Sequence, residues 1–214
     1  NFLDPAGAKT GKLFPTGNAR ETLDLGELGT IEATILDVSN PMVLVRAADL
    51  GITGTQLPAE VDADKALAAK LEAIRGAACV KMGFAKDPAD ATANSPAVPK
   101  VGFVTAPASF TDISGKSVDV CARVISVFKC HKACPLTSAS SISVAAFVPG
   151  TLVHELVVFK PGQQTVRIGH PSGVMTMYPY LDDPTKPLND IVVSGVAVQR
   201  TARRIMDGTL YIRK

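Results

Sequence analysis

Apolar residues recur every three or four positions in one part of the chain. Between Asp62 and Gly83 this spacing is followed by Leu67, Leu71, Ile74, Ala78 and Met82. It places these residues on one face of an α-helix, whose start Asp62 or Asp64 can cap and whose end Gly83 can terminate in the left-handed conformation. We predict a helix over residues 62–83 and a loop over the proline-containing residues 87–99.

Alternation of apolar and polar positions predicts β-strands in most of the remaining chain. Residues 30–38 alternate in this way, and residues 42–45 have the composition of a buried strand. Asn40-Pro41 between them predicts one long bent strand, or two strands joined at a bulge. Further strands are predicted at residues 101–104, 117–128, 151–159, 165–169, 174–178, 191–203 and 209–213. Because tight turns are expected to join some of them, we expect a mostly antiparallel sheet. Those turns are Pro161-Gly162, Ser172-Gly173 and Asp207-Gly208.

Residues 137–148 form a second predicted helix, and nearly all its side chains are small: Ser138, Ala139, Ser140, Ser141, Ser143, Ala145 and Ala146. Small side chains let neighbouring backbones approach closely, which suits the crowded centre of a barrel better than a solvated surface. Pro149-Gly150 ends the helix. We expect residues 1–214 to form a single α+β domain, in which a mostly antiparallel, barrel-like sheet wraps around this central small-residue helix.

The composition narrows the classes of function. Hydrophobic residues make up 46% and charged residues 20% of the chain, which indicates an ordinary folded protein. Nucleic-acid binding is not expected, because it usually needs a dense basic face with stacking aromatic residues. Here the formal net charge is only +2 and aromatic residues are 5%. No apolar run approaches the roughly 20 residues that a membrane span requires, so no membrane association is expected.

The four cysteines are expected to be reduced thiols of a cytoplasmic protein rather than a disulfide framework. They are Cys79, Cys121, Cys130 and Cys134. The run Cys130-His131-Lys132-Ala133-Cys134 raises the question of a metal. A c-type haem site needs the order Cys-x-x-Cys-His, and a tetrahedral zinc needs a fourth ligand, usually from a second pair. We therefore predict no metal at this run.

The same run leads into the small-residue helix. We expect Thr137 and Ser138 to cap that helix, and its free N–H groups to face a cavity. A helix start of this kind favours a carboxylate, because the amides and the helix dipole both attract negative charge. His131 and Lys132 would add donors nearby. The alternative is a loop that simply enters a helix.

The run Gly169-His170-Pro171-Ser172-Gly173 lies between two predicted strands. One interpretation is a β-turn whose histidine is satisfied locally, and the other is a site wall with His170 and Ser172 as hydrogen-bond donors. A Ser-His hydrolase is not expected, because no nucleophile elbow or orienting third group accompanies this pair. Asn40 can likewise make a local turn hydrogen bond or present its amide to a carboxylate. The arginines of residues 200–204 can keep an edge strand soluble or hold a carboxylate.

An ordered set of motifs spans nearly the whole chain. The set comprises Phe2-Leu3-Asp4-Pro5-Ala6-Gly7, Leu13-Phe14-Pro15-Thr16-Gly17-Asn18, Asp37-Val38-Ser39-Asn40-Pro41, Ile74-Arg75, Val98-Pro99-Lys100, Pro149-Gly150-Thr151, Gly169-His170-Pro171-Ser172-Gly173 and Arg200-Thr201-Ala202-Arg203. It resembles the PrpF family of methylaconitate and aconitate isomerases, which also includes 4-oxalomesaconate tautomerase and 3-methylitaconate isomerase. The resemblance implies the diaminopimelate epimerase fold. In that fold, two similar α+β halves each place a barrel-like sheet around a central helix, and the active site lies in the cleft between them.

Within that fold the chain resembles the second, C-terminal half, which fits a start at Asn1 that reads like the middle of a protein. In epimerases of this fold the central helix of the second half begins with a catalytic cysteine. The matching position here is Pro135, and Cys134 is one residue out of register. The family's lysine and cysteine proton carriers belong to the first half. The resemblance therefore implies that a missing N-terminal lobe supplies them, and it leaves the catalytic residues of this chain unknown.

The resemblance implies a cofactor-independent isomerase that shifts a double bond by proton transfer in an unsaturated tricarboxylate such as aconitate or methylaconitate. This chain would form one wall of the site and bind the small-molecule di- or tricarboxylate, without a metal. Its expected donors are Thr137 and Ser138 first, then Asn40 and Ser172, then His170 and His131. A homodimer is compatible with this interpretation. The alternative is a non-catalytic domain of the same fold that binds a carboxylate or a partner chain.

Overall fold

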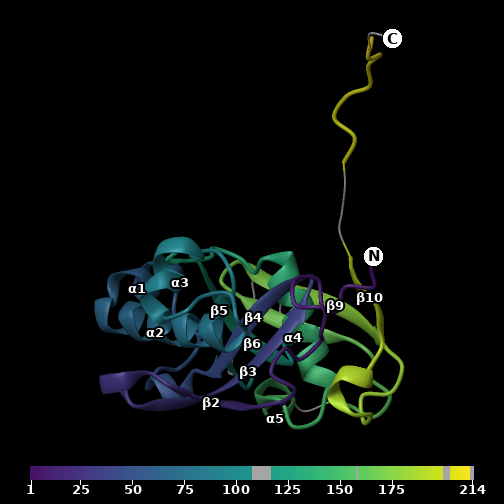
Figure 1. Ribbon diagram of the computed structural model, residues 1–214. Coiled ribbons are helices and arrows are strands. Elements are labelled where there is room, and N and C mark those ends of the chain that lie inside the picture. Colours follow the sequence, from purple (N-terminus) through teal and green to yellow (C-terminus); the bar gives the residue numbers. More distant parts are fainter. Residues whose placement is uncertain (108–116, 158, 200–202, 213–214) are drawn as a thin grey trace.

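The computed structural model describes residues 1–107, 117–157, 159–199 and 203–212. Ten strands form one sheet in this part of the chain (Figure 1). They are β1 (Phe2–Leu3), β2 (Glu21–Asp24), β3 (Thr30–Val38), β4 (Asn40–Arg46), β5 (Lys100–Thr105), β6 (Val120–Ser126), β7 (Lys129–Cys130), β8 (Val166–His170), β9 (Gly173–Leu181) and β10 (Val193–Val198). The helices are α1 (Pro58–Ala63), α2 (Lys65–Lys81), α3 (Pro88–Asn94), α4 (Leu136–Phe147) and α5 (Leu152–Leu156). Within the described residues, no helix combines the length and hydropathy that a membrane span requires.

The sheet is mostly antiparallel, as the sequence predicts. Its strand order is β1-β10-β9-β8-β6-β5-β4-β3-β2, with β7 paired to β6 beside this path. Only the pairs β4/β5 and β6/β8 are parallel among the described strands. The predicted barrel-like closure is not confirmed, because this strand order has two ends, β1 and β2, that do not pair with each other.

The two faces of the sheet bury different helices. On β4, for example, Met42 and Leu44 belong to the hydrophobic core that contains α4 and α5. Val43 and Val45 belong to the core that contains α2. Successive side chains of a strand point to opposite faces, so this division places α4 and α2 on opposite sides of the sheet (Figure 1). The small-residue helix α4 is buried along most of its length, as its composition predicts.

The predicted helix over residues 62–83 is confirmed as α2, with a shorter start. Asp64 caps it, since its side chain accepts a hydrogen bond from the Leu67 N–H at 2.9 Å. Asp62 instead lies in α1, and its carboxylate accepts a bond from the Cys130 N–H at 2.8 Å. Gly83 has a positive φ of 77° just after the helix, as expected for a left-handed terminator.

Three local predictions are wrong. Residues 87–99 are not a plain loop, because Asp87 caps α3 and Pro88 occupies its first position. Residues 151–159 are not a strand, because Thr151 caps α5. Around Asn40-Pro41 there is neither one long bent strand nor a bulge: the chain reverses at Ser39, whose φ is 61°, and β3 and β4 pair as an antiparallel hairpin. In addition, residues 209–212 form no strand, whereas residue 213 of that predicted strand lies outside the described residues.

Candidate functional site

Several segments that are distant in sequence meet at one end of the sheet. β4 and β5 are parallel and both start there, and β6, which is antiparallel to β5, ends there. β8 runs parallel to β6, and its last residues pair with the first residues of β6. α4 begins at this same end. Contacts confirm the grouping: Ser141 Oγ of α4 donates to the Val38 carbonyl at 3.2 Å, and Ser172 Oγ donates to the Lys132 carbonyl. The start of α4, the turn between β3 and β4 and the turn between β8 and β9 are therefore neighbours.

The N-terminus of α4 has no side-chain cap. Pro135 occupies the cap position and lacks a side chain that could accept a hydrogen bond. The first amide of this region to bond within the turn is that of Ala139, which donates to the Pro135 carbonyl at 2.9 Å. The N–H groups of residues 136–138 have no acceptor among the described residues. Thr137 and Ser138 thus lie in the first helical turn, and the prediction that they cap the helix is wrong. The free amides that the prediction required are nevertheless present.

Ser138 is the most unusual side chain of this helix. It is 2% exposed, and its Oγ has no hydrogen-bond partner in the described protein. The neighbouring hydroxyls of Ser140, Ser141 and Ser143 all donate to backbone carbonyls. A buried hydroxyl without a partner costs free energy. Ser138 therefore offers a buried hydroxyl that no described residue uses.

The turn between β3 and β4 carries more unpaired polar atoms. Ser141, one helical turn after Ser138 and on the same face, contacts the Val38 and Asn40 carbonyls of this turn. The buried Oγ of Ser39 has no partner in the described residues, and neither has Oδ1 of Asp37. The other oxygen of Asp37 accepts bonds from the backbone N–H groups of Lys9 and Thr10. Buried polar groups of this kind are rare in folded proteins, and three of them lie at or beside this corner.

His170 lies at the end of β8 and is 7% exposed. Val120 pairs with Ile168 in register, so His170 shares the face of the sheet that α4 covers. Its Nδ1 accepts a hydrogen bond from the Ser172 N–H at 3.2 Å, so the neutral ring carries its proton on Nε2. Burial, together with the nearby Arg123 and His131, lowers the pKa of His170. At neutral pH this ring is therefore an uncharged N–H donor.

The other predicted site residues form hydrogen bonds within the chain. The Ser172 hydroxyl donates a hydrogen bond to the Lys132 carbonyl. The side-chain amide of the half-buried Asn40 donates a long hydrogen bond of 3.3 Å to the Pro41 carbonyl. His131 is exposed, and its Nδ1 accepts a bond from the Ala133 N–H at 3.1 Å. The interpretation of a turn whose histidine is satisfied locally is confirmed for Nδ1 of His170, and the interpretation of this turn as a site wall stays a prediction.

Sequence reasoning assigned no role to Lys100. This half-buried residue starts β5 and pairs in register with Met42, whose side chain belongs to the α4 core. Its ammonium acts electrostatically on the Cys134 thiol, which immediately precedes the start of α4. No hydrogen bond or ion pair joins that ammonium to another described residue. The motif Val98-Pro99-Lys100 was the available signal, but the pairing with Met42 cannot be read from it.

The cysteines near this site are neutral thiols. Burial raises the pKa of Cys134 to about 12 and that of Cys130 to about 11. Neither is therefore a thiolate nucleophile at neutral pH. All four cysteines lie in the described residues, and none forms a disulfide, which confirms the prediction of reduced thiols. Among the described residues, no group of three or more His, Cys, Asp or Glu side chains is placed to hold a metal ion.

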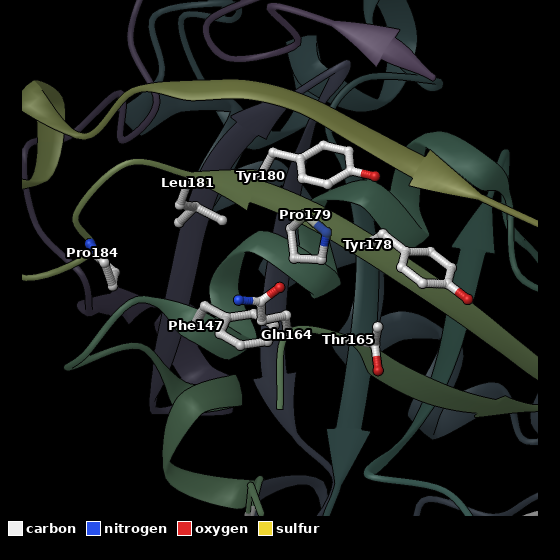
Figure 2. A pocket seen from close by; sticks show the side chains of 8 residues that line it. All are labelled: Phe147, Gln164, Thr165, Tyr178, Pro179, Tyr180, Leu181 and Pro184. Carbon is white, nitrogen blue, oxygen red and sulfur yellow. The ribbon is translucent and has the colours of Figure 1, made fainter. Parts of the chain in front are cut away.

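A cavity of about 470 Å³ lies at the opposite end of α4. Figure 2 shows its lining side chains: Phe147, Gln164, Thr165, Tyr178, Pro179, Tyr180, Leu181 and Pro184. They include no carboxylate, amine or imidazole, and most of them are apolar. We therefore place the candidate site at the start of α4 and not in this cavity.

Comparison with known proteins gives a consistent picture. The family profile described as "PrpF protein" matches residues 1–213. The 3-methylitaconate isomerase of Eubacterium barkeri is 39% identical, over 100% of this chain and 56% of that protein. The 2-methyl-aconitate isomerase of Shewanella oneidensis is 34% identical, over 100% of this chain and 54% of that protein. A solved structure, "Crystal Structure of Methylitaconate-delta-isomerase", superposes with a TM-score of 0.80 at 35% identity, over 94% of this chain and 53% of that one.

The chain spans about half the length of the curated relatives that it matches. Its matched region is nevertheless continuous and includes both the small-residue helix and the turn at His170. The chain therefore belongs to the PrpF family.

Proposed function

We propose that this chain forms the carboxylate-binding wall of an isomerase, which moves a double bond by proton transfer in an unsaturated tricarboxylate such as aconitate or methylaconitate. The observation that carries the proposal is the uncapped start of α4, where free amides lie beside the partnerless hydroxyl of Ser138. The names of the relatives support the reaction class, since they are isomerases of methylitaconate, methylaconitate and oxalomesaconate.

The start of α4 can bind one substrate carboxylate. The amides of residues 136–138 and the Ser138 hydroxyl are donors, and the helix dipole adds positive potential. Lys100 supplies an ammonium without a partner among the described residues, on the face of the sheet that α4 covers. A second carboxylate of the same substrate would be neutralised by this charge. Together these groups orient a polyanion without using any residue that can accept a proton from carbon.

The reaction requires a base, an acid and stabilisation of negative charge. A base removes a proton from the allylic carbon, the double bond moves by one position, and a proton is returned to the far carbon, so the product is an isomer. Fixed N–H donors stabilise the dienolate-like charge that develops between these steps. Besides the helix amides, the Nε2–H of His170 is the donor of this chain that would form a hydrogen bond with a substrate bound at α4.

We propose that the companion lobe supplies the base and the acid. Cys130 and Cys134 are neutral, and His170 is an N–H donor, so the described residues here offer binding groups rather than a proton carrier. The resemblance to the PrpF family implies that a lysine and a cysteine of the first half would take that role. This chain would then be the second lobe of a two-lobe enzyme, with the substrate between the lobes.

The test uses the whole polypeptide and the chain of 214 residues side by side. Each is incubated in heavy water with aconitate, 2-methylaconitate or 3-methylitaconate, and proton exchange and isomer composition are followed by NMR. We expect exchange and isomerisation with the whole polypeptide, and binding without exchange with residues 1–214 alone. Failure of the whole polypeptide to exchange any of the three acids would contradict the proposal.

A second function is favoured by the neutral state of the Cys130 and Cys134 thiols, whose pKa values are raised by burial. The chain would then be a non-catalytic carboxylate-binding domain of the same fold. Tight binding of a tricarboxylate by the whole polypeptide, without exchange of any carbon-bound proton, would identify that function and exclude the isomerase.

A further inference from the structure

The largest fully buried side chain of the described residues is that of Arg123, and the carboxylate site does not account for it. Arg123 lies in β6 and is 1% exposed. Its Nε donates to the Gln56 carbonyl at 2.6 Å, and its Nη2 donates to the Thr55 carbonyl at 2.9 Å. Nη1 donates to the Ala122 carbonyl at 2.9 Å. Carbonyl groups satisfy hydrogen bonds but carry no net charge, so these contacts leave the guanidinium charge in place.

A second buried arginine shows what is missing at Arg123. Arg75 is 3% exposed, and Glu72 neutralises it in an ion pair of 2.5 Å. In the described part of the chain, no carboxylate forms an ion pair or a hydrogen bond with Arg123. Glu60 acts on it through its charge alone, and this carboxylate is exposed and accepts from the Leu57 N–H at 2.6 Å. A buried charge without a partner is unusual, because leaving water costs free energy that an ion pair would offset.

Two thiols near Arg123 do not supply the missing negative charge. Cys130 and Cys134 both lie close enough to interact with it electrostatically. Burial raises their pKa values to about 11 and about 12, so both are neutral near pH 7. Burial also lowers the pKa of Arg123, but an arginine keeps its proton near neutral pH. The folded domain therefore holds a positive charge that these neighbours leave unneutralised.

Arg123 lies directly behind the candidate site. Cys121 of β6 pairs with Gly169 of β8, so His170 is level with the residue that precedes Arg123. The two side chains point to opposite faces of the sheet, because Arg123 pairs with Phe103 of the α2 core and His170 lies on the α4 face. Arg123 nevertheless interacts electrostatically with His170 and with the thiol that precedes α4. Packed protein instead of water separates these groups, so the charge is weakly screened.

We propose that Arg123 is a specificity-determining residue: its buried charge acts through the sheet on the start of α4 and favours ligands with several carboxylates over ligands with one. This inference rests on the carboxylate site proposed above. A polyanion bound there supplies the negative charge that is missing around Arg123, and each further carboxylate adds to the attraction. The helix amides, by contrast, contact a single carboxylate. Because Arg123 lies behind the sheet, it selects by charge and not by contact.

Two variants of the whole polypeptide separate charge from packing. Arg123→Gln removes the charge, whereas Arg123→Lys keeps it but lacks the planar fork that makes the three hydrogen bonds. NMR titration measures the affinity for aconitate, with three carboxylates, and for crotonate, with one. We expect Arg123→Gln to lose at least ~10-fold for aconitate and less than ~3-fold for crotonate, and Arg123→Lys at pH 6 to lose less than ~3-fold for both. Equal losses for the two acids, or for the two variants, overturn the proposal.

Arg123→Lys also covers the case in which Arg123→Gln does not fold. Burial lowers the pKa of a lysine, so the ammonium introduced here loses its proton as the pH rises, whereas the native guanidinium does not. Relative to the native protein, the affinity of Arg123→Lys for aconitate should therefore fall at least ~5-fold between pH 6 and pH 9, with an unchanged circular dichroism spectrum. A pH profile parallel to that of the native protein overturns the proposal.

The pKa of His170, measured by NMR without ligand, is an independent test. It should rise in Arg123→Gln, because a positive charge that disfavours the imidazolium is removed. Lys129→Gln is the matched control: it removes one charge from neighbouring β7, but from a side chain that is 73% exposed, and should change neither this pKa nor the affinity. An unchanged His170 pKa in Arg123→Gln overturns the proposal. Isomerisation is measured separately, so binding without isomerisation contradicts only the proposed reaction.

Discussion

The carbonyl groups at the C-terminal end of α4 are bonded by side chains of the following segment. Thr151 Oγ1 lies 2.6 Å from the Ala145 carbonyl and 3.1 Å from that of Val148. His154 Nδ1 lies 2.9 Å from the Ala146 carbonyl. Phe147 stacks on Phe159 with ring centroids 4.4 Å apart. At the N-terminal end the amides of residues 136–138 and the Ser138 hydroxyl have no partner in the described protein.

The contrast separates stability from binding along one helix. Thr151 and His154 bond the carbonyl groups at one end of α4, whereas Pro135 cannot cap the other end. The free N–H groups at that other end can therefore donate hydrogen bonds to an anion. Each unsatisfied buried donor costs roughly 1–3 kcal/mol. A bound carboxylate removes that cost, so the N-terminal end should respond to ligand and the C-terminal end to unfolding.

The largest effect is expected from a negative charge placed at the binding end. Thr137→Asp puts a carboxylate in the first turn of α4, where it occupies the amides and repels a substrate anion. We expect affinity for a tricarboxylate to fall at least ~100-fold, which corresponds to about 2.7 kcal/mol. Calorimetry on the 214-residue chain measures this affinity. Thr137→Asn is the neutral control and should lose much less. Equal loss in the two variants would refute an electrostatic role for this helix start.

The next effect concerns the opposite end. Thr151→Ala removes the hydroxyl that bonds the end of α4 and also accepts from the His154 N–H at 3.1 Å in α5. The free energy of unfolding should fall by about 2 kcal/mol, as measured by urea denaturation. Tricarboxylate affinity of the folded protein should stay unchanged. Thr151→Ser retains the hydroxyl and should retain most of the stability. Weakened binding in Thr151→Ala would break the proposed division between the two ends.

The sequence reveals helix α4 itself but not the short helix that follows its C-terminal end. Small residues and the stop at Pro149-Gly150 reveal α4, but the β-branched run after Thr151 reads as a strand. In the structure its start becomes α5, because Thr151 caps a turn in which Leu152 is buried and donates to Thr34 Oγ1 at 3.0 Å. Thr34 is distant in sequence, so this tertiary contact is invisible to a local pattern. Asp87-Pro88 was misread for a simpler reason, since proline also marks the first position of a helix.

In the candidate site, too, local composition reveals some residues, whereas the position of others depends on strand pairing. The turn at His170 and the start of α4 carry recognisable composition, so sequence reasoning found both. Lys100 was missed because its position depends on the parallel pairing of β5 with β4, which brings it opposite Met42. The start of α4 was placed one residue late because Thr137 and Ser138 have the composition of caps. Pro135 takes that position instead, and it leaves the amides unbonded.

A smaller effect separates Ser138 from its neighbours. Ser138→Ala removes a hydroxyl without a partner, so the free energy of unfolding without ligand should change by less than ~0.5 kcal/mol or rise. Ser143→Ala removes a hydroxyl that donates to the Ser140 carbonyl at 2.8 Å and should cost about 1 kcal/mol. Tricarboxylate affinity should fall about tenfold in Ser138→Ala only. Urea denaturation and calorimetry give both quantities, and a stability loss in Ser138→Ala as large as that in Ser143→Ala would mean that its hydroxyl already has a partner.

The smallest expected effect is the contribution of His170 to the pH dependence of stability. Its pKa is lowered in the folded protein by burial and by the nearby Arg123 and His131. Below the ordinary histidine pKa of about 6.5, the unfolded chain therefore binds more protons at this residue than the folded one. The contribution is complete above that pH and is lost as the pH falls through the lowered pKa.

In His170→Asn, whose side-chain oxygen can still accept from the Ser172 N–H, the rise in unfolding free energy from about pH 5 to pH 7 should be smaller by less than ~1 kcal/mol. Urea denaturation across this range measures it. An unchanged slope in His170→Asn would show that the ring accepts a proton at this corner without penalty, and His170 could then no longer serve as the neutral N–H donor beside α4.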